Sequence, residues 1–116
     1  MIAGGDVAKI SRTKLDMEWS FAVRSRDHWT CQKCGSRYPP KMPGDGSSRS
    51  GLDAAHIFSR RLKRMRHDLD NGVALCTGCH LSWAHYKPLE FREWIMEWLG
   101  AEKYEALRLR AQEVKK

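Results

Sequence analysis

Four cysteines constrain the fold of this 116-residue chain more than any other feature. They form two C-x2-C pairs, Cys31/Cys34 and Cys76/Cys79, which stand far apart in the sequence. Each pair can supply two thiolates from one tight turn, and two pairs complete the tetrahedral shell that structural zinc prefers. We therefore predict one structural Zn²⁺ that is bound by all four cysteines. It would hold together the two ends of the segment between the cysteine pairs.

Other uses of the cysteine pairs stay open at this point. Redox motifs are the main alternative, but the chain lacks the βαβ pattern in which they occur. An iron–sulfur cluster is the second alternative. Gly4, Gly5 and Asp6 stand where a signal peptide would carry its apolar stretch, so we expect a cytoplasmic protein with reduced thiols. No apolar run approaches the roughly 18 residues of a membrane span, and we expect no membrane association.

The apolar pattern predicts a small α+β fold. Leu15, Trp19, Ala22 and Val23 have the spacing of one helix face, which predicts a helix over 13–28. Further elements are expected as short strands over 52–58 and 73–75, a short helix after Cys79, a helix over 88–99 and another ending near residue 114.

The length of the chain is that of one domain. We expect a single domain over 1–116, with a core of about 20–86 and a C-terminal helical extension of about 88–114. A polar surface loop rich in glycine and proline is expected over 38–51.

Three polar residues lie on the predicted elements in an order that indicates a function. His56 lies in the first strand, Asn71 at the turn before the second, and His80 directly after the last cysteine, where a helix begins. Strand, turn, strand and helix form a ββα unit, and this order resembles the HNH endonuclease family. The resemblance covers roughly residues 20–86 and is closest to zinc-containing members from phages and prophages, in which a basic stretch like Ser59-Arg60-Arg61 follows the first histidine.

The resemblance implies a ββα-metal fold and a role for each of these residues. His56 would be the general base, Asn71 would orient it, and His80 would hold a catalytic Mg²⁺ or Mn²⁺. Many members carry a further metal ligand directly before the base, where this chain has Ala55. Asp53 lies on the same strand face as position 55, so we predict that it supplies the second ligand.

Two further histidines could complete the metal shell. His85 follows His80 by five residues, which is off the i+3 or i+4 spacing of neighbours on an α-helix, so a surface role is favoured. His67 lies in a loop beside the predicted site, where contact with DNA or local packing is favoured over metal binding.

Basic residues are dense between the predicted base and Asn71. The net charge of the chain is +7, which favours a polyanion as partner. Arg60, Arg61 or Arg66 could bind phosphate or stabilise charge in the transition state, because guanidinium groups bind phosphate oxygens bidentately. We predict Arg61 and Arg66 as catalytic residues that contact DNA. A solvated loop is the alternative. Three tryptophans are predicted to belong to the core: Trp83, Trp94 and Trp98.

Taken together, these features predict a metal-dependent DNA endonuclease. A single ββα site would reach one strand at a time, so we expect nicking of duplex DNA by a monomer or weak dimer. A non-catalytic zinc-ribbon module that binds DNA is the alternative, with His56 and His80 in structural roles. A zinc domain that binds other proteins is a third reading, and it predicts no salt-dependent affinity for DNA.

Overall fold

The computed structural model describes residues 13–39 and 51–113, and these form an α+β fold. The elements in chain order are α2 (Lys14–Arg26), β1 (Leu52–His56), α3 (Lys63–Arg66), the short helix η2 (Leu69–Asn71), β2 (Gly72–Cys76), the π-helix η3 (Cys79–Ala84), α4 (Pro88–Leu99) and α5 (Ala101–Glu113). The loop predicted over 38–51 lies almost wholly outside the described residues. Among the described helices, none is both long and apolar enough to span a membrane.

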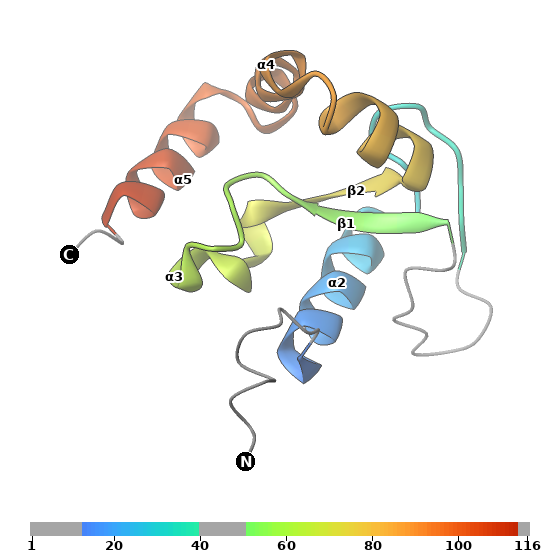
Figure 1. The fold of residues 1–116 in the computed structure, drawn as a ribbon, viewed down its shortest axis with the longest axis horizontal. Coiled ribbons are helices and arrows are strands. Elements are labelled where there is room, and N and C mark those ends of the chain that lie inside the picture. Colours follow the sequence, from blue (N-terminus) through green and yellow to red (C-terminus); the bar gives the residue numbers. More distant parts are fainter. Residues whose placement is uncertain (1–12, 40–50, 114–116) are drawn as a thin grey trace.

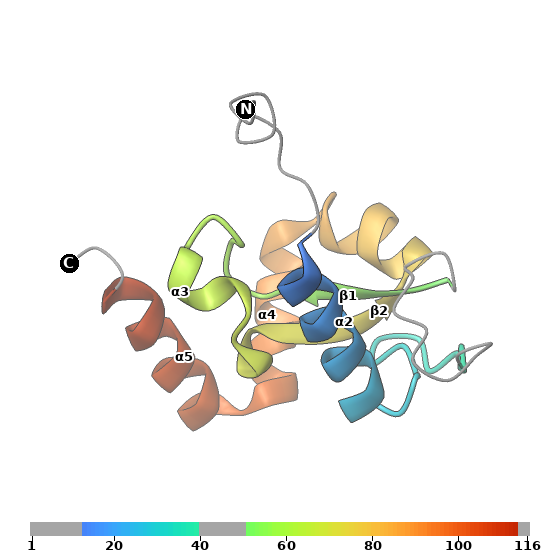
Figure 2. The ribbon, with the colours of Figure 1, turned by 90° about the horizontal axis from the view of Figure 1, so that it is seen from below.

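The two strands form an antiparallel sheet on which the helices pack. Leu52 pairs with Cys76 at one end of the sheet and His56 pairs with Gly72 at the other. Helix α2 lies on one face of the sheet, and η3 with α4 lies on the other, as Figures 1 and 2 show. Because β1 pairs with β2 alone in the described part of the chain, its second edge is open to a ligand.

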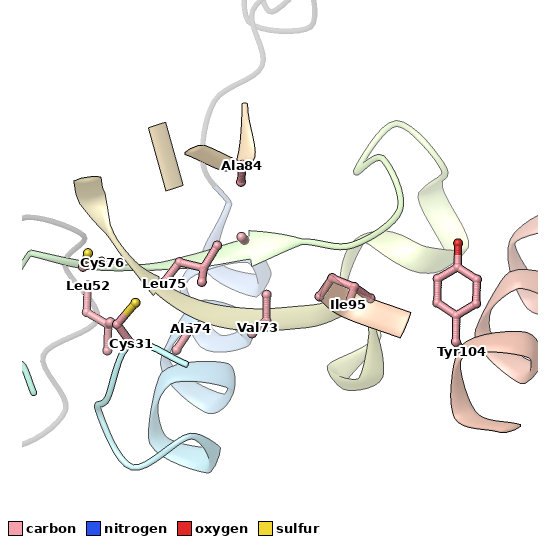
Figure 3. Close-up of a cluster of buried hydrophobic side chains, with 10 residues drawn as sticks. Cys31, Leu52, Val73, Ala74, Leu75, Cys76, Ala84, Ile95 and Tyr104 are labelled. Carbon is pink, nitrogen blue, oxygen red and sulfur yellow. The ribbon is translucent and has the colours of Figure 1, made fainter. Parts of the chain in front are cut away.

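The core follows the sheet from the cysteines to the C-terminal helices. Every residue of β2 is buried, and Ile95 of α4 and Tyr104 of α5 extend the same cluster (Figure 3). A smaller cluster of Met65, Leu107 and Ala111 joins α3 to α5. The three tryptophans predicted to be core residues are partly buried and pack against the main cluster.

Helix α2 matches the predicted span closely but buries a different face. Its first turn is a capping box, in which Thr13 accepts a hydrogen bond from the amide of Asp16 and the Asp16 carboxylate accepts one from Thr13. Leu15, which was predicted to be buried, is exposed, and Asp16 is buried instead. The reason is that Arg66, the last residue of α3, and His67, directly after it, meet the Asp16 carboxylate at this inward position.

Gly72 lets α2 approach the sheet closely. A Cβ atom here would lie 2.6 Å from Cζ2 of Trp19 and 2.7 Å from Cγ2 of Val23. Both side chains are buried, and the Trp19 indole is fixed because it donates a hydrogen bond of 2.8 Å to the Asp68 carbonyl. We expect Gly72→Ala to lower the free energy of unfolding by about 1–3 kcal/mol, as overpacking typically does, which a urea titration would measure.

Gly78→Ala is the matched control for that substitution. The nearest atom to a Cβ at Gly78 is the Cys76 sulfur at 4.0 Å, so the methyl group has room. Equal denaturation midpoints for the two variants would contradict the tight contact between α2 and β2.

Candidate active site

The four cysteines lie together at the end of the sheet where Leu52 pairs with Cys76. Their sulfurs all lie within 4.8 Å of one another, and those of Cys34 and Cys76 are 3.9 Å apart. Four sulfurs bound to one tetrahedral zinc at about 2.3 Å would be about 3.8 Å apart. In the part of the chain that the structure describes, this is the only such group of three or more metal-ligating side chains. The donor set therefore fits a zinc ion.

The local backbone prepares the sulfurs for a cation. In each pair the amide of the second cysteine donates to the sulfur of the first at 3.4 Å. Gly35, with φ of 83°, permits the tight turn after Cys34. Hydrogen bonds with the side chain and then the backbone of Ser36 lower the pKa of the Cys34 thiol to about 6, which favours the thiolate that binds metals.

A cleft of about 810 Å³ runs along the open edge of β1. Its lining includes the consecutive residues 53–57, so it receives side chains from both faces of the strand. Helix α2 supplies one wall, while η3, α4 and Tyr104 of α5 supply the other. Three of the predicted site residues line this cleft: Asp53, His56 and His80.

His56 is held in one orientation from two sides. Its ring stacks on Trp19 with a centroid distance of 4.0 Å and an interplanar angle of 11°. Its Nε2 lies 2.9 Å from the backbone carbonyl oxygen of Arg66. A carbonyl oxygen can only accept, so Nε2 carries the proton and the neutral ring has its lone pair on Nδ1. Burial lowers the pKa of His56, which keeps the ring neutral near pH 7.

The backbone around Arg66 is in turn fixed by Asp16. The Asp16 carboxylate accepts hydrogen bonds from Nε and Nη2 of Arg66 at 2.8 and 2.6 Å, and its Oδ1 lies 2.6 Å from Nε2 of His67. Hydrogen bonding from Arg66 holds the pKa of Asp16 well below its usual range. The sequence reading missed Asp16 as a site residue, because an aspartate three residues after a threonine at a helix start is already explained as a cap.

Asp53 and His80 face each other in the same cleft. The Oδ2 atom of Asp53 lies 3.0 Å from Nδ1 of His80. The two atoms form a hydrogen bond in this structure, and a carboxylate oxygen beside an imidazole nitrogen is a donor pair that can also hold a divalent cation such as Mg²⁺ or Mn²⁺. Asp53 thus lies beside His80, and its role as a metal ligand stays a prediction.

His85 lies beside His80, contrary to the spacing argument. Helix η3 is a π-helix, and the His85 amide donates to the His80 carbonyl at 3.2 Å. The i+5 repeat of a π-helix places the two rings edge to face with centroids 4.7 Å apart, and both line the cleft. His85 is exposed, as expected, but the spacing argument assumed α-helical geometry and therefore did not place its ring beside His80.

Asn71 is fully buried and bonds to backbone rather than to His56. Its Oδ1 accepts from the Phe58 amide at 2.7 Å, and its Nδ2 donates to the carbonyls of Phe58 and Met65 at 2.9 and 3.0 Å. The amide thus closes the loop that leads from β1 to the Arg66 carbonyl, which contacts His56. Any orienting effect of Asn71 on His56 passes through this loop.

The arginines differ in how they are partnered. Arg66 is paired with Asp16, and Arg61 is exposed and is not part of the cleft lining. Arg60 lines the cleft, as does Arg92 of α4. Neither of these two has an acidic partner among the described residues. Arg92 was missed because the pattern of 88–99 indicated only a packing helix.

The comparisons with known proteins bear on the same segment. Residues 31–87 match a family model described as HNH endonuclease. The match begins at Cys31 and includes Asp53, His56, Asn71 and His80, whereas α2, α4 and α5 lie outside it. No curated protein and no solved structure matches the chain.

Proposed function

Because the chain belongs to the HNH endonuclease family over residues 31–87, we propose that it is a metal-dependent DNA endonuclease. One observation carries this proposal: a neutral imidazole and a carboxylate–histidine pair line the same cleft. We place the reaction on a ββα-metal core made of β1, β2 and η3, within one domain that includes the flanking helices.

His56 is the general base in this proposal. Its Nδ1 takes a proton from the attacking water while the water oxygen bonds to phosphorus and a phosphorus–oxygen bond of the backbone breaks. The Arg66 carbonyl then stabilises the imidazolium through the Nε2 hydrogen bond, and the stacked Trp19 keeps the ring in plane. Asn71 contributes by holding the loop that positions this carbonyl.

The metal sites follow from the donor sets. The four cysteines hold a structural Zn²⁺. Asp53 and His80 hold a catalytic Mg²⁺ or Mn²⁺, and His85 is a third ligand if its ring turns toward the pair. When bound, this cation stabilises negative charge on the phosphate and on the leaving oxygen.

DNA is the proposed substrate because of charge. The net charge of +7 favours a polyanion, and Arg60, which has no acidic partner among the described residues, lines the cleft. Arg61 and Arg66 stay predicted DNA contacts, although Arg66 would have to contact phosphate while paired with Asp16. A single cleft reaches one strand at a time, so we propose nicking by a monomer or weak dimer, without a sequence preference assigned.

The decisive experiment follows supercoiled plasmid in a gel assay. Zinc-loaded protein dialysed free of other cations should leave the plasmid intact, and added Mg²⁺ or Mn²⁺ should convert it first to the nicked circle. A DNA-binding zinc ribbon would shift the plasmid without cutting it. A protein-binding zinc domain would do neither, and either result would reject the endonuclease.

The rate of cleavage should depend on pH through His56. The base works only when neutral, so kcat/KM should rise with pH as the ring loses its proton and then level off. Because burial lowers the pKa of His56, the midpoint of this rise should lie below the ordinary value of 6.5. Measuring kcat/KM across the acidic range checks this.

Arg60 provides a control for the pH profile. Its charge also lowers the pKa of His56, so Arg60→Gln should move the midpoint upward whatever it does to DNA binding. A wild-type midpoint above 6.5, or one unmoved in Arg60→Gln, would assign the titration to another group.

A further inference from the structure

We propose that Arg92 and Tyr104 form a second phosphate-binding subsite in the cleft, which holds a DNA backbone phosphate next to the one that is cut. This inference rests on the proposed endonuclease function. Both residues lie outside the matched family segment, so the subsite is a feature of the C-terminal helices α4 and α5.

The guanidinium of Arg92 is fixed in place by two contacts. Its Nη1 donates a hydrogen bond of 2.6 Å to the hydroxyl of Tyr104, and its central carbon lies 5.6 Å from the centroid of the Phe58 ring. Tyr104 is buried and Phe58 is packed against the same core, so both supports are anchored. Fixing the group in advance reduces the entropy that it loses when it binds an anion.

The remaining donors of Arg92 are available for an anion. A guanidinium has five N–H groups, and Tyr104 takes one of them. Four remain, including the Nε and Nη2 pair that binds two oxygens of one phosphate side by side. The contact with the Phe58 ring is a cation–π contact and uses none of these N–H donors for a hydrogen bond.

Charge pairing separates Arg92 from four other arginines of the described chain. Four guanidinium groups are paired with carboxylates: Arg26 with Asp27, Arg66 with Asp16, Arg108 with Glu105 and Arg110 with Asp68. Arg92 has a tyrosine hydroxyl where these have a carboxylate. Its positive charge therefore remains uncompensated within a cleft, where it attracts an anion most strongly.

The shape of the cleft explains why the anion is a neighbouring phosphate of the same strand. The lining includes Asp53 and His80 near the start of β1, and Arg92 and Tyr104, which contact Phe58 just beyond its end. A volume of about 810 Å³ is larger than a single phosphate needs. A strand that places one phosphate at the Asp53–His80 pair would thus bring another toward Arg92.

The test measures DNA affinity separately from cleavage. Anisotropy of a labelled duplex is followed over a salt series with His56→Ala protein, which carries in addition Arg92→Gln, Arg92→Lys or Tyr104→Phe. Arg108→Gln is the matched control, since it also removes one exposed guanidinium from a C-terminal helix but lies outside the cleft. Steady-state cleavage by the corresponding single variants gives KM and kcat.

Arg92→Gln should weaken binding about tenfold and reduce the slope of log K against log salt by about 0.9, the value for one lost phosphate contact. KM should rise with kcat nearly unchanged, Arg92→Lys should recover part of the affinity, and Tyr104→Phe should show a smaller loss. If Arg92→Gln does not fold, the other two variants decide. Affinity and slope equal to those of Arg108→Gln would overturn the subsite, whereas absence of cleavage by the wild type would overturn the endonuclease alone.

Discussion

His56→Ala should lower the rate of DNA cleavage by about 10²–10⁴-fold while zinc content and DNA affinity stay near those of the wild type. The expected loss is large because the imidazole is positioned for one task. Its Nε2 is committed to the Arg66 carbonyl and its ring to Trp19, which leaves Nδ1 as the proton acceptor. Alanine offers no group that can take the proton.

Single-turnover cleavage of a labelled duplex with saturating Mg²⁺ or Mn²⁺ measures this effect, because it separates chemistry from product release. His28→Asn is the matched control. His28 is exposed, lies outside the cleft, and has φ of 59°, a conformation that asparagine tolerates. Equal rates for His56→Ala and the wild type would return His56 to a structural role and favour the DNA-binding zinc ribbon.

The parts of the site that could be predicted are those set by short-range geometry. Two C-x2-C pairs must each form a compact turn, so their clustering follows once the strands between them pair. Strand alternation likewise placed Asp53 toward His80, because the period of a strand is fixed at two. In both cases the backbone conformation near the residue determines where its side chain points.

The features of the site that the sequence did not predict depend on the helix type and on contacts between distant segments. The local sequence pattern determines neither. His85 reaches the cleft only because η3 is a π-helix, and five-residue spacing in an α-helix would have turned it away. Asp16 takes the inner face of α2 in place of Leu15 because its hydrogen-bond partners, Arg66 and His67, come from a segment distant in the sequence. Hydrophobicity alone could not predict that an aspartate would be buried while the adjacent leucine is exposed.

The proposed role of Arg92 could not be predicted from the sequence either. Its neighbours along the chain, Phe91 and Trp94, are packing residues, so the helix reads as part of the core. The cleft in which Arg92 could bind a phosphate is formed by residues of α2, β1, η3, α4 and α5 together. A residue that acts only in such an assembly becomes visible when the elements are placed in space.

The largest effect on stability should come from the cysteines. Cys34→Ser should release the zinc and leave the domain largely unfolded at physiological temperature. Cys34 is exposed, and exchanging sulfur for oxygen at an exposed position ordinarily changes stability by less than about 0.5 kcal/mol. Structural zinc, in contrast, contributes about 10–16 kcal/mol in zinc-finger peptides, as much as the whole net stability of a typical domain.

Thermal unfolding followed by circular dichroism, with zinc measured in the same sample, tests this expectation. Thr77→Ala is the control, because Thr77 is an exposed residue of the second knuckle that supplies no sulfur. Its unfolding midpoint should stay close to that of the wild type, while Cys34→Ser loses its cooperative transition. The loss should reach the cleft as well, since the cysteine cluster fixes the end of the sheet from which β1 carries Asp53 and His56. A Cys34→Ser protein that keeps both its midpoint and one tightly bound zinc would show that the sheet and its helices hold this arrangement without the fourth sulfur.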